Sequence, residues 1–508
     1  MKRIIYFSLL ILSSVLIFNS CAKDSEDSIR GISNSNSPSL ESDDVFSNIP
    51  EGTSELPPSG GEGYDEYDEN DFILTFDEAV STFSIDADGA SYANVRRFLN
   101  SGELPPQGAI RTEELINYFP MEYEYPTGND LMKMNAEVAV CPWNSSNYLM
   151  RIGARGKDIP ANQLPNSNFV FLIDVSGSMN RPDKIELLKQ SFIEFVEFLP
   201  ADDRIAIVTY SGSSNVILNS TPVSQASTII NAIESLQTGG GTNGAEGIIT
   251  AYEIAEANFI EGGNNRLIVG TDGDFNIGVS SSEGLVELIE EKREGGVFLS
   301  VLGFGTGNLQ DGKMESISNN GNGTYEYIDA TPQATKVFID EYKKFYAAAK
   351  DVKMQITFNQ STVEAYRLIG YENRLLATED FEDDTKDAGE LGINQTITAL
   401  YEIVPASGGS IFTDLGVIDY RYKQIDADVS EEFTLAIPNN IYSFNNSSEN
   451  MRFTAAVAGY GMLLWGSEYS GDLNFNDVKT WAQNASSYDP GDWREEFIDL
   501  VQIAEDLQ

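Results

Sequence analysis

The chain has 508 residues, enough for about three domains, and 41% of them are hydrophobic, which excludes disorder along its whole length. Its 32 basic residues stand against 79 acidic ones, and the net charge of −47 makes nucleic acid and anionic lipid head groups unsuitable partners. Histidine is absent, which excludes Ser-His-Asp catalysis, Cys-His catalysis and His-ligated zinc. We therefore do not expect an enzyme.

The N-terminus has the pattern of a secretory signal. Lys2 and Arg3 precede an apolar run over residues 4–18, which is shorter than the ~20 residues that a membrane-spanning helix needs. We assign residues 1–20 to a signal peptide. The segment Phe18-Asn19-Ser20-Cys21 resembles a bacterial lipobox, which implies cleavage before Cys21 and acylation of its thiol. An ordinary signal peptide with an incidental cysteine is the alternative.

Lipidation at Cys21 would place the protein in the bacterial cell envelope, anchored to the outer membrane through lipid only. Acidic residues within 24–27 resemble the export signal of surface-exposed lipoproteins and favour the outer face over the periplasmic face. The other cysteine, Cys141, then has no intramolecular partner, and its apolar neighbours predict a buried thiol at a strand end.

Residues 21–80 are predicted to form an acidic, flexible tether. The stretch up to about residue 75 is poor in aliphatic side chains, so too little apolar surface is available to offset the entropy of an ordered chain. Two interpretations of the acidic segment 62–71 remain open. It is either a solvated linker, which we favour, or a strap that offers a carboxylate to the metal site described below.

Two flanking regions, residues 81–165 and 350–508, surround a central domain. In the first region, apolar spacing predicts helices over 91–99 and 112–119, followed by two strands on either side of Pro142. In the second, strands are predicted first and helices after them: 352–358, 364–368, 396–403 and 420–422, then 451–464, 477–483 and 493–507. We expect the strands of both regions to pair, so that the central domain is inserted into a β-sandwich.

The central domain, residues 166–349, alternates strands and helices. The continuous apolar strand 169–173 is typical of a sheet covered on both faces. The short turn between strands 204–210 and 215–218 predicts an antiparallel pair. Further strands (266–270, 297–302, 325–328) and helices (184–198, two before residue 266, 283–294, 332–348) follow in turn. This alternation predicts an α/β fold with a doubly wound, mostly parallel sheet.

Oxygen-bearing side chains follow the strands of this domain in three loops. Asp174, Ser176 and Ser178 come directly after the first strand, Thr242 lies in a glycine-rich loop before a helix, and Asp272 follows the next parallel strand. All three loops should lie at the carboxyl edge of the sheet, near the point where the strand order reverses. Open α/β sheets bind their ligands there.

These loops resemble the metal-ion-dependent adhesion site (MIDAS) of the von Willebrand factor A (VWA) domain. The resemblance implies that Ser176, Ser178 and Thr242 supply hydroxyl ligands and that Asp174 and Asp272 bind the metal or hold its waters. Hard oxygen ligands of this kind suit Mg²⁺, Mn²⁺ or Ca²⁺. With only two carboxylates the ion is under-neutralised, and a Glu or Asp carboxylate of a protein partner can complete its shell.

The resemblance extends over residues 80–508 to one bacterial family of VWA lipoproteins with its own N-terminal and C-terminal regions. It is carried by segments 81–86, 91–97, 264–269, 271–276, 302–305 and 367–374. One departure is visible, because the family has a Gly-His pair where this chain has Asn394 and Gln395. A role assigned to that histidine does not transfer to this chain, and the resemblance does not name a physiological partner.

Three functions remain open at this stage. The leading hypothesis is metal-dependent protein binding, by adhesion or scaffolding, at the cell envelope. The second is a structural assembly platform in which the metal only stabilises the fold. The third and weakest is a hydrolase that uses paired carboxylates, for which no substrate cleft can be inferred.

Three further patterns in the sequence have simpler explanations than a binding site. The glycines of residues 303–307 lack the G-x-G-x-x-G spacing and a basic residue to anchor phosphate, so we expect no nucleotide. Asp383, Asp384, Asp387 and Glu390 could hold a second Ca²⁺ or form a solvated turn. Residues 86–89 are interpreted as a turn or helix cap rather than a metal loop.

Overall fold

The computed structural model describes residues 61–86, 88–273, 282–407, 414–425 and 427–508. These residues belong to one compact unit that starts at Thr53. The signal peptide, Cys21 and the first part of the tether lie outside the described residues. Within those ranges, no helix is both long and apolar enough to cross a membrane.

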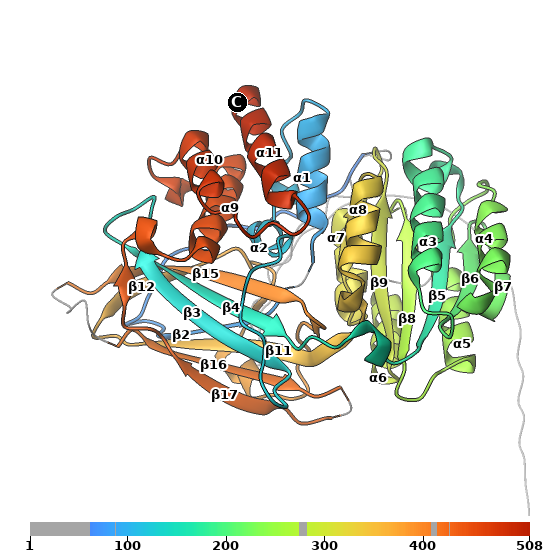
Figure 1. The fold of residues 1–508 in the computed structure, drawn as a ribbon, viewed down its shortest axis with the longest axis horizontal. Coiled ribbons are helices and arrows are strands. Elements are labelled where there is room, and N and C mark those ends of the chain that lie inside the picture. The colour runs from blue at the N-terminus through green and yellow to red at the C-terminus, as the bar shows by residue number, and fades with distance from the viewer. Residues whose placement is uncertain (1–60, 87, 274–281, 408–413, 426) are drawn as a thin grey trace, which may run out of the picture. The chain divides into compact units, whose positions relative to one another are not determined.

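The central domain contains the predicted doubly wound sheet (Figure 1). Its strand order is β10-β9-β8-β5-β6-β7, and all neighbours are parallel except β6 and β7. The strands are β5 (Ser167–Asp174), β6 (Arg204–Tyr210), β7 (Ser214–Pro222), β8 (Asn264–Thr271), β9 (Val297–Phe304) and β10 (Tyr325–Ile328). The chain leaves β5 toward β6 and later returns to the other side of β5 as β8, so the strand order reverses at β5.

Helices cover both faces of this sheet. Phe171 of β5 packs with side chains of α3 (Leu187–Phe198), α4 (Ala226–Glu234) and α8 (Thr331–Thr335). Leu172, the next residue, points to the opposite face, where it packs with α5 (Gly244–Ala257), α6 (Ser282–Glu294) and α7 (Asp311–Asn320). Burial on both faces explains why β5 is apolar throughout its centre.

The last predicted helix of the domain, residues 332–348, is wrong at its end. After α8 the chain makes a π turn at Lys336–Asp340 and a 3₁₀ turn at Tyr342–Phe345, and the strand β11 begins at Ala347. The alanines at 347–349 have a high helix propensity, but they pair with Leu391–Gly392 in a ladder. Tertiary pairing overrides their local preference.

A β-sandwich is built from both flanking regions. One sheet has the order β1-β12-β15-β4-β3-β18 and the other β13-β2-β11-β16-β17, with β14 paired to β11. The strands are β1 (Ile73–Leu74), β2 (Val80–Ser84), β3 (Met132–Val140), β4 (Tyr148–Gly156), β11 (Ala347–Phe358), β12 (Val363–Ile369), β13 (Leu375–Leu376), β14 (Leu391–Gly392), β15 (Thr396–Pro405), β16 (Gly416–Lys423), β17 (Glu431–Ala436) and β18 (Ile441–Tyr442).

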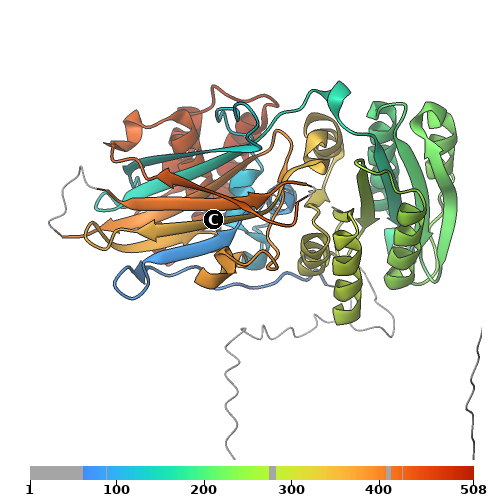
Figure 2. The same ribbon diagram turned by 90° about the horizontal axis from the view of Figure 1, so that it is seen from below.

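The predicted insertion of the central domain into this sandwich is confirmed. Strand β2 precedes the domain and pairs with β11, which follows it, and β4 pairs with β15 in the same way. Figures 1 and 2 show strands from the two halves of the sequence lying side by side. Phe83, Met150, Met354 and Tyr401 contribute to the buried core that these strands share.

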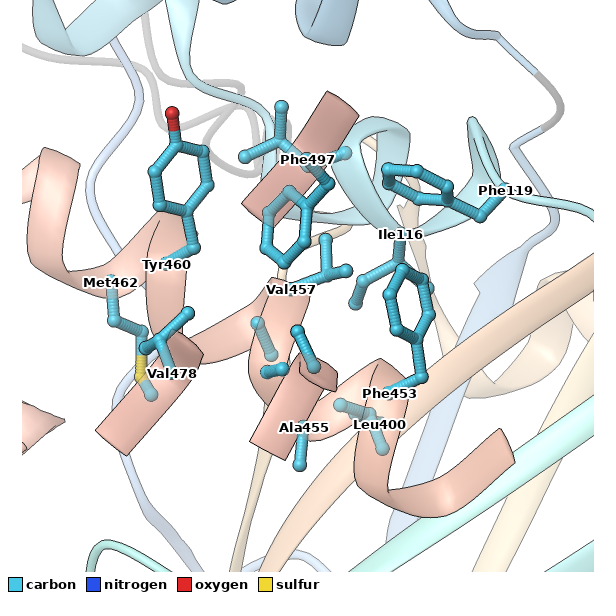
Figure 3. Close-up of a cluster of buried hydrophobic side chains, with 14 of the residues drawn as sticks. Ile116, Phe119, Leu400, Phe453, Ala455, Val457, Tyr460, Met462, Val478 and Phe497 are labelled. Carbon is cyan, nitrogen blue, oxygen red and sulfur yellow. The ribbon is translucent and has the colours of Figure 1, made fainter. Parts of the chain in front are cut away.

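Helices from the two flanking regions form a second layer on the sandwich. They are α1 (Ala90–Asn100), α2 (Thr112–Asn117), α9 (Glu449–Trp465), α10 (Phe475–Gln483) and α11 (Trp493–Leu507). The ring of Phe119 lies 4.9 Å from that of Phe453 and 5.6 Å from that of Phe497, both edge to face (Figure 3). Cys141 is buried in this cluster, as predicted, and burial raises the pKa of its thiol.

The predicted end of the tether at residue 80 is wrong, because residues 61–80 pack on the folded body. The backbone of Gly63 pairs with the segment around Gln310, and β1 and β2 join the two sheets. Two acidic side chains pair with arginines of the folded body: Glu62 contacts the half-buried Arg97 at 2.8 Å, and Glu69 contacts the buried Arg367 at 2.9 Å. Composition alone does not reveal such partners, which lie far away in the sequence.

Candidate metal centre

The three predicted ligand loops meet at the carboxyl edge of the central sheet. The loop after β5 and the glycine-rich loop are joined by backbone hydrogen bonds: Gly239 N donates to Val175 O at 2.8 Å and Gly177 N to Gly240 O at 3.4 Å. Asp174 ends β5, and Asp272 follows the end of the neighbouring strand β8. Thr242 belongs to the glycine-rich loop, and its side chain is half-buried.

Asp174 is fully buried and held by donors on both carboxylate oxygens. Oδ1 accepts from Ser176 N at 2.8 Å, and Oδ2 accepts from Tyr210 Oη and Thr271 Oγ1, each at 3.2 Å. Burial, together with the nearby charge of Asp272, raises the pKa of Asp174 to about 7. The carboxylate is thus fixed in direction, and its ionised form is penalised without a cation.

The two serine hydroxyls have the spacing that a metal ion requires. Ser176 Oγ and Ser178 Oγ lie 2.9 Å apart. Neighbouring ligands of an octahedral Mg²⁺, each about 2.1 Å from the ion, are separated by about 3 Å. Ser176 is buried while Ser178 is half-buried, so the pair lies at the border between the protein and solvent. This geometry fits one ion that is reached from outside.

Asp272 is buried beside a cation of the protein itself. Its Oδ2 accepts from Lys184 Nζ at 2.9 Å, and the same ammonium donates to Asn308 Oδ1. The Lys184 stem packs so closely on Gly305, where φ is +73°, that a Cβ there would lie 2.2 Å from Lys184 Cγ. Glycine at 305 therefore serves close packing in a left-handed backbone conformation.

The donor set fits a hard divalent cation. The predicted ligands are carboxylates and hydroxyls, which Mg²⁺, Mn²⁺ and Ca²⁺ prefer. Lys184 offsets one of the two carboxylates. A divalent ion would therefore keep a net positive charge after binding, which favours one further anionic oxygen from outside.

Lys184, Tyr210 and Thr271 were not predicted as members of the site. Signals for two of them exist in the sequence, because Tyr210 ends a predicted strand and Thr271 stands directly before Asp272. Both positions lie at the same edge of the sheet as the ligands. Lys184 had no such signal, since only the packing of the π turn Pro182–Glu186 brings its ammonium to Asp272.

The acidic stretch 383–390 is not assembled into one ligand set by its described contacts. Asp384 pairs with Arg421 at 2.7 Å, and Asp387 pairs with Arg293 at 2.6 Å. These two carboxylates thus bind different arginines, on the sandwich and on α6. Of the two predictions for this stretch, a second Ca²⁺ site is the less supported.

Another acidic group is gathered elsewhere, with arginines as its partners. The carboxylates of Asp86, Asp88 and Glu114 come within 4.8 Å of one another, and all three are buried. Arg374 Nε donates to Asp86 at 2.8 Å, and Arg111 pairs with Glu114. Asp86 also accepts from Asp88 N at 2.9 Å, and α1 begins without a side-chain cap, so the interpretation of residues 86–89 as a turn or cap rather than a metal loop stays a prediction.

Comparisons with known proteins match the three parts of the chain. Residues 168–341 match the family described as von Willebrand factor type A domain, residues 58–151 that described as von Willebrand factor, and residues 343–507 that described as the C-terminal part of the uncharacterized protein YfbK. The uncharacterized protein YfbK of Escherichia coli (strain K12) is 39% identical over 470 residues, which cover 87% of this chain and 81% of that protein.

More distant relatives match over smaller parts. The uncharacterized protein sll0103 of Synechocystis is 26% identical over 34% of this chain and 40% of its own. Inter-alpha-trypsin inhibitor heavy chain H3 of Homo sapiens is 28% identical over 33% of this chain and 20% of its own. A solved structure, von Willebrand factor type A from Catenulispora acidiphila, is 14% identical with a TM-score of 0.45, covering 76% of this chain and 91% of that one.

Proposed function

Because this chain belongs to the bacterial VWA family that includes YfbK of Escherichia coli, we propose that it binds one divalent cation and, through that ion, a carboxylate of a protein partner. VWA domains commonly bind a divalent metal, and we expect Mg²⁺ here, with Mn²⁺ or Ca²⁺ as substitutes. Asp174, Ser176, Ser178, Thr242 and Asp272 would hold it. The observation that carries the proposal is the 2.9 Å spacing of the Ser176 and Ser178 hydroxyls beside the buried Asp174.

The charges around the site support an anionic partner. When bound, the ion would supply a Lewis-acidic position for one oxygen of the partner. Asp174 and Asp272 carry the negative charge of the site, and Lys184 cancels part of it. The protein side therefore leaves part of the ion's charge uncompensated, and a Glu or Asp of the partner fits this remainder better than a neutral group.

The loops of the site are already connected by hydrogen bonds and an ion pair. This favours a metal that binds a partner over a metal with a purely structural role. Backbone hydrogen bonds already connect the loop after β5 to the glycine-rich loop, and Lys184 already supplies Asp272 with a positive charge. We therefore expect the fold to hold these segments together without the ion. The alternative, an assembly platform in which the metal only stabilises the fold, requires a large loss of stability on chelation.

Calorimetric titration of Mg²⁺ into the purified protein tests the site. We expect about one ion per chain, and we expect Asp174→Asn to weaken Mg²⁺ binding at least 100-fold. Asp203→Asn is the matched control, because Asp203 is also buried in this domain but accepts from Ser167 N at the opposite edge of the sheet. Equal affinities in wild type and Asp174→Asn would refute the assignment.

Partner binding is tested with an acidic peptide that carries one glutamate at its centre. We expect binding in Mg²⁺, loss of binding with chelator, and loss in Asp174→Asn. A peptide with glutamine in place of that glutamate is the control. If both peptides bind alike, the metal does not recruit a carboxylate. If chelation instead lowers the melting temperature strongly and no peptide binds, the structural platform is the better account.

We also propose an envelope location, with the protein anchored to the outer membrane by a lipid on Cys21 and displayed at the surface. This part is supported by the sequence of the first 27 residues. Labelling cells with a palmitate analogue should mark the wild type and leave Cys21→Ser unmarked. Label retained in Cys21→Ser would refute the anchor. Protease treatment of whole cells should remove the protein if it faces outward and spare it if it faces the periplasm.

A further inference from the structure

A cavity of about 420 Å³ lies away from the metal centre, where several parts of the fold meet. The end of β4, the segments after α2 and α8, the turn before β15 and the loop before α11 all line it, and Figure 1 labels these elements. Its volume is in the range of small-molecule sites, which is about 300–1,000 Å³. The charged, amide and aromatic side chains that line it include Tyr118, Arg155, Lys336, Asn394, Tyr488 and Trp493.

Arg155 borders this cavity as a buried cation with neutral partners only. Its guanidinium donates to Tyr123 O at 3.0 Å, to Tyr125 Oη at 2.7 Å and to Asn394 Oδ1 at 2.7 Å. Arg155 is only 5% exposed, and its Nε has no hydrogen-bond partner. Burying a cation without a counter-charge is costly, so an anion that enters here gains both a charge partner and hydrogen-bond donors.

Arg155 is one of the buried arginines that lack a carboxylate partner in the part of the chain that the structure describes, and it borders the cavity. Among the described residues, Arg155, Arg266 and Arg494 are the buried arginines without an ion pair, and of these Arg155 lines the cavity. Arg151, four residues earlier on the same strand, does have a carboxylate partner, Glu137, at 3.5 Å. Of these two buried arginines on β4, the one without a carboxylate partner is therefore the one that lines the cavity.

The lysines of the cavity lining already have carboxylate partners. Lys336 pairs with Glu341, and Lys344 pairs with Glu326 and with Glu341. Lys343 Nζ contacts Asp158 at 2.6 Å. Asp340, a further carboxylate of the lining, lies exposed at the surface rather than buried beside Arg155. The Arg155 guanidinium is thus a buried positive charge of the lining without a carboxylate partner among the described residues, although the net charge of the chain is −47.

Aromatic side chains supply the apolar part of the lining. Tyr118, Tyr488 and Trp493 border the cavity, and the rings of Tyr118 and Trp493 lie 6.0 Å apart, edge to face. Lys336 Nζ lies 4.4 Å from the ring centre of Tyr118 and 5.8 Å from that of Trp493. The ring of Tyr118 is already covered, because it stacks on Tyr92 at 3.9 Å and lies against Lys336. Tyr488 and Trp493, both half-buried, remain to pack against a flat or ring-shaped group whose charged end reaches the guanidinium.

Asn394 places its side-chain oxygen, a neutral hydrogen-bond acceptor, beside Arg155. Its backbone has φ of +63°, a left-handed conformation, and its N donates to Lys157 O at 3.1 Å. This conformation directs the amide oxygen of Asn394 to the guanidinium. A carboxylate of a ligand can take the place of this neutral oxygen and makes the stronger hydrogen bond, because both partners are then charged.

We propose that this cavity binds a small organic anion that carries a single ring, with Arg155 as the partner of its carboxylate and Tyr488 and Trp493 as the walls for its ring. The site is independent of the metal centre and of the proposed partner binding. It would make the protein responsive to a small metabolite of the compartment in which it resides.

Calorimetry with 4-hydroxyphenylacetate and with its neutral amide tests the charge requirement. The acid should bind, and the amide should bind at least ten-fold more weakly because the charge-assisted bond to Arg155 is lost. Chelator should leave the affinity unchanged, which separates this site from the metal centre. If neither the acid nor glucuronate, a non-aromatic ring acid, binds at millimolar concentration, the proposal is wrong. Equal binding of acid and amide also overturns it.

Two arginine variants test the residue. Arg155→Met should weaken binding of the acid at least ten-fold, while Arg151→Met, a buried arginine of the same strand outside the cavity lining, should leave it within two-fold. If both substitutions weaken binding of the acid equally, the effect is not specific to Arg155, and the assignment is overturned. If Arg155→Met does not fold, Trp493→Phe gives a second readout. It should remove the change in tryptophan fluorescence that the acid causes in the wild type, and a persistent change would contradict the proposed walls.

Discussion

Burial raises the pKa of individual carboxyl groups in this protein, and this makes metal binding and stability depend on pH. Asp174 is the clearest case, because burial and the charge of Asp272 raise its pKa to about 7. Metal binding needs the ionised carboxylate, so protons compete with the ion below that pH. The affinity of the protein for Mg²⁺ should therefore fall by up to about ten-fold per pH unit below pH 7 and level off above pH 8.

Titrations with Mg²⁺ at pH 6, 7 and 8 measure this dependence. Asp203 also has a raised pKa, about 6, owing to burial, and it lies at the other edge of the sheet. The Asp203→Asn variant should therefore keep the pH dependence of the wild type. An affinity that is the same at pH 6 and pH 8 would contradict the role given to Asp174.

Glu113 makes the stability of the fold depend on pH. It is buried at the start of α2, its Oε2 has no hydrogen-bond partner, and burial with the nearby charge of Glu372 raises its pKa to about 8. The unfolded chain releases this proton near pH 4.3. Between these values the folded state binds more protons, so the free energy of unfolding should decrease as pH rises from about 4.5 to 8.

The variant Glu113→Gln keeps the shape of the side chain and cannot ionise. Its free energy of unfolding should decrease less between pH 5 and pH 8 than that of the wild type, by up to roughly 1.4 kcal/mol for each pH unit. Urea unfolding at several pH values measures this difference. Glu103→Gln is the control, since Glu103 is exposed, and its stability should follow the wild type. A pH profile for Glu113→Gln identical to that of the wild type would count against this account.

The segment 61–71 was predicted to be part of a flexible tether, but it packs on the folded body. Glu62 accepts from both terminal nitrogens of Arg97, at 2.8 and 3.1 Å, and from Gly307 N at 2.8 Å. The segment therefore lies against the loop that follows β9, and its first carboxylate is committed to Arg97. A donation of this carboxylate to the metal would require breaking these bonds.

The substitution Glu62→Gln should loosen this segment without affecting the metal. We expect loss of about 1–3 kcal/mol of stability, from the weaker bonds to Arg97, and faster cleavage of residues 61–72 by protease. The affinity for Mg²⁺ should stay within two-fold of the wild type. A rise in Mg²⁺ affinity would instead show that the segment competes for the metal site.

Glycine at position 273 shows how tightly the elements of the metal centre are packed. Its φ is +89°, and a Cβ would lie 2.4 Å from Gln310 N. The loop after β8 thus passes directly beside the loop after β9, on which the segment 61–71 rests. Asp272 precedes this contact, so the packing of three separate segments positions its carboxylate.

The net charge of the molecule and the proposed metal ion have opposite effects on the association with an acidic partner. A partner that is acidic overall is repelled by a chain of net charge −47, while one of its carboxylates is attracted by the proposed ion. Salt screens the long-range repulsion, with a Debye length of about 8 Å at physiological ionic strength, and barely affects direct coordination. Association with an acidic partner should therefore become faster as NaCl rises, while chelator still abolishes binding.

Stopped-flow mixing with the glutamate peptide, extended by an acidic tail, measures this effect between 20 and 300 mM NaCl. The same peptide with a neutral tail is the control and should associate at a rate that depends little on salt. Slower association of the acidic peptide at high salt would contradict the balance of forces proposed here.

Local patterns in the sequence determined the type of fold and the site. Strand-helix alternation predicted the doubly wound sheet, and the loops of Asp174, Thr242 and Asp272 were placed correctly at its carboxyl edge, because strand ends and loop residues are local features. The pairing of flanking strands into a sandwich was also predicted and is confirmed by β2 and β11. The predicted ligand set itself awaits the titrations above.

Tertiary structure alone decided which charges meet. The pairs Lys184–Asp272 and Glu62–Arg97, and the unpaired Arg155, could not be read from the sequence. The same holds for Ala347–Ala349, whose helix propensity yields to a strand partner near residue 391. The physical reason is common to all of them. Periodicity and turn residues act over a few neighbours, whereas burial, ion pairing and the pKa of a side chain depend on segments that only the folded chain brings together.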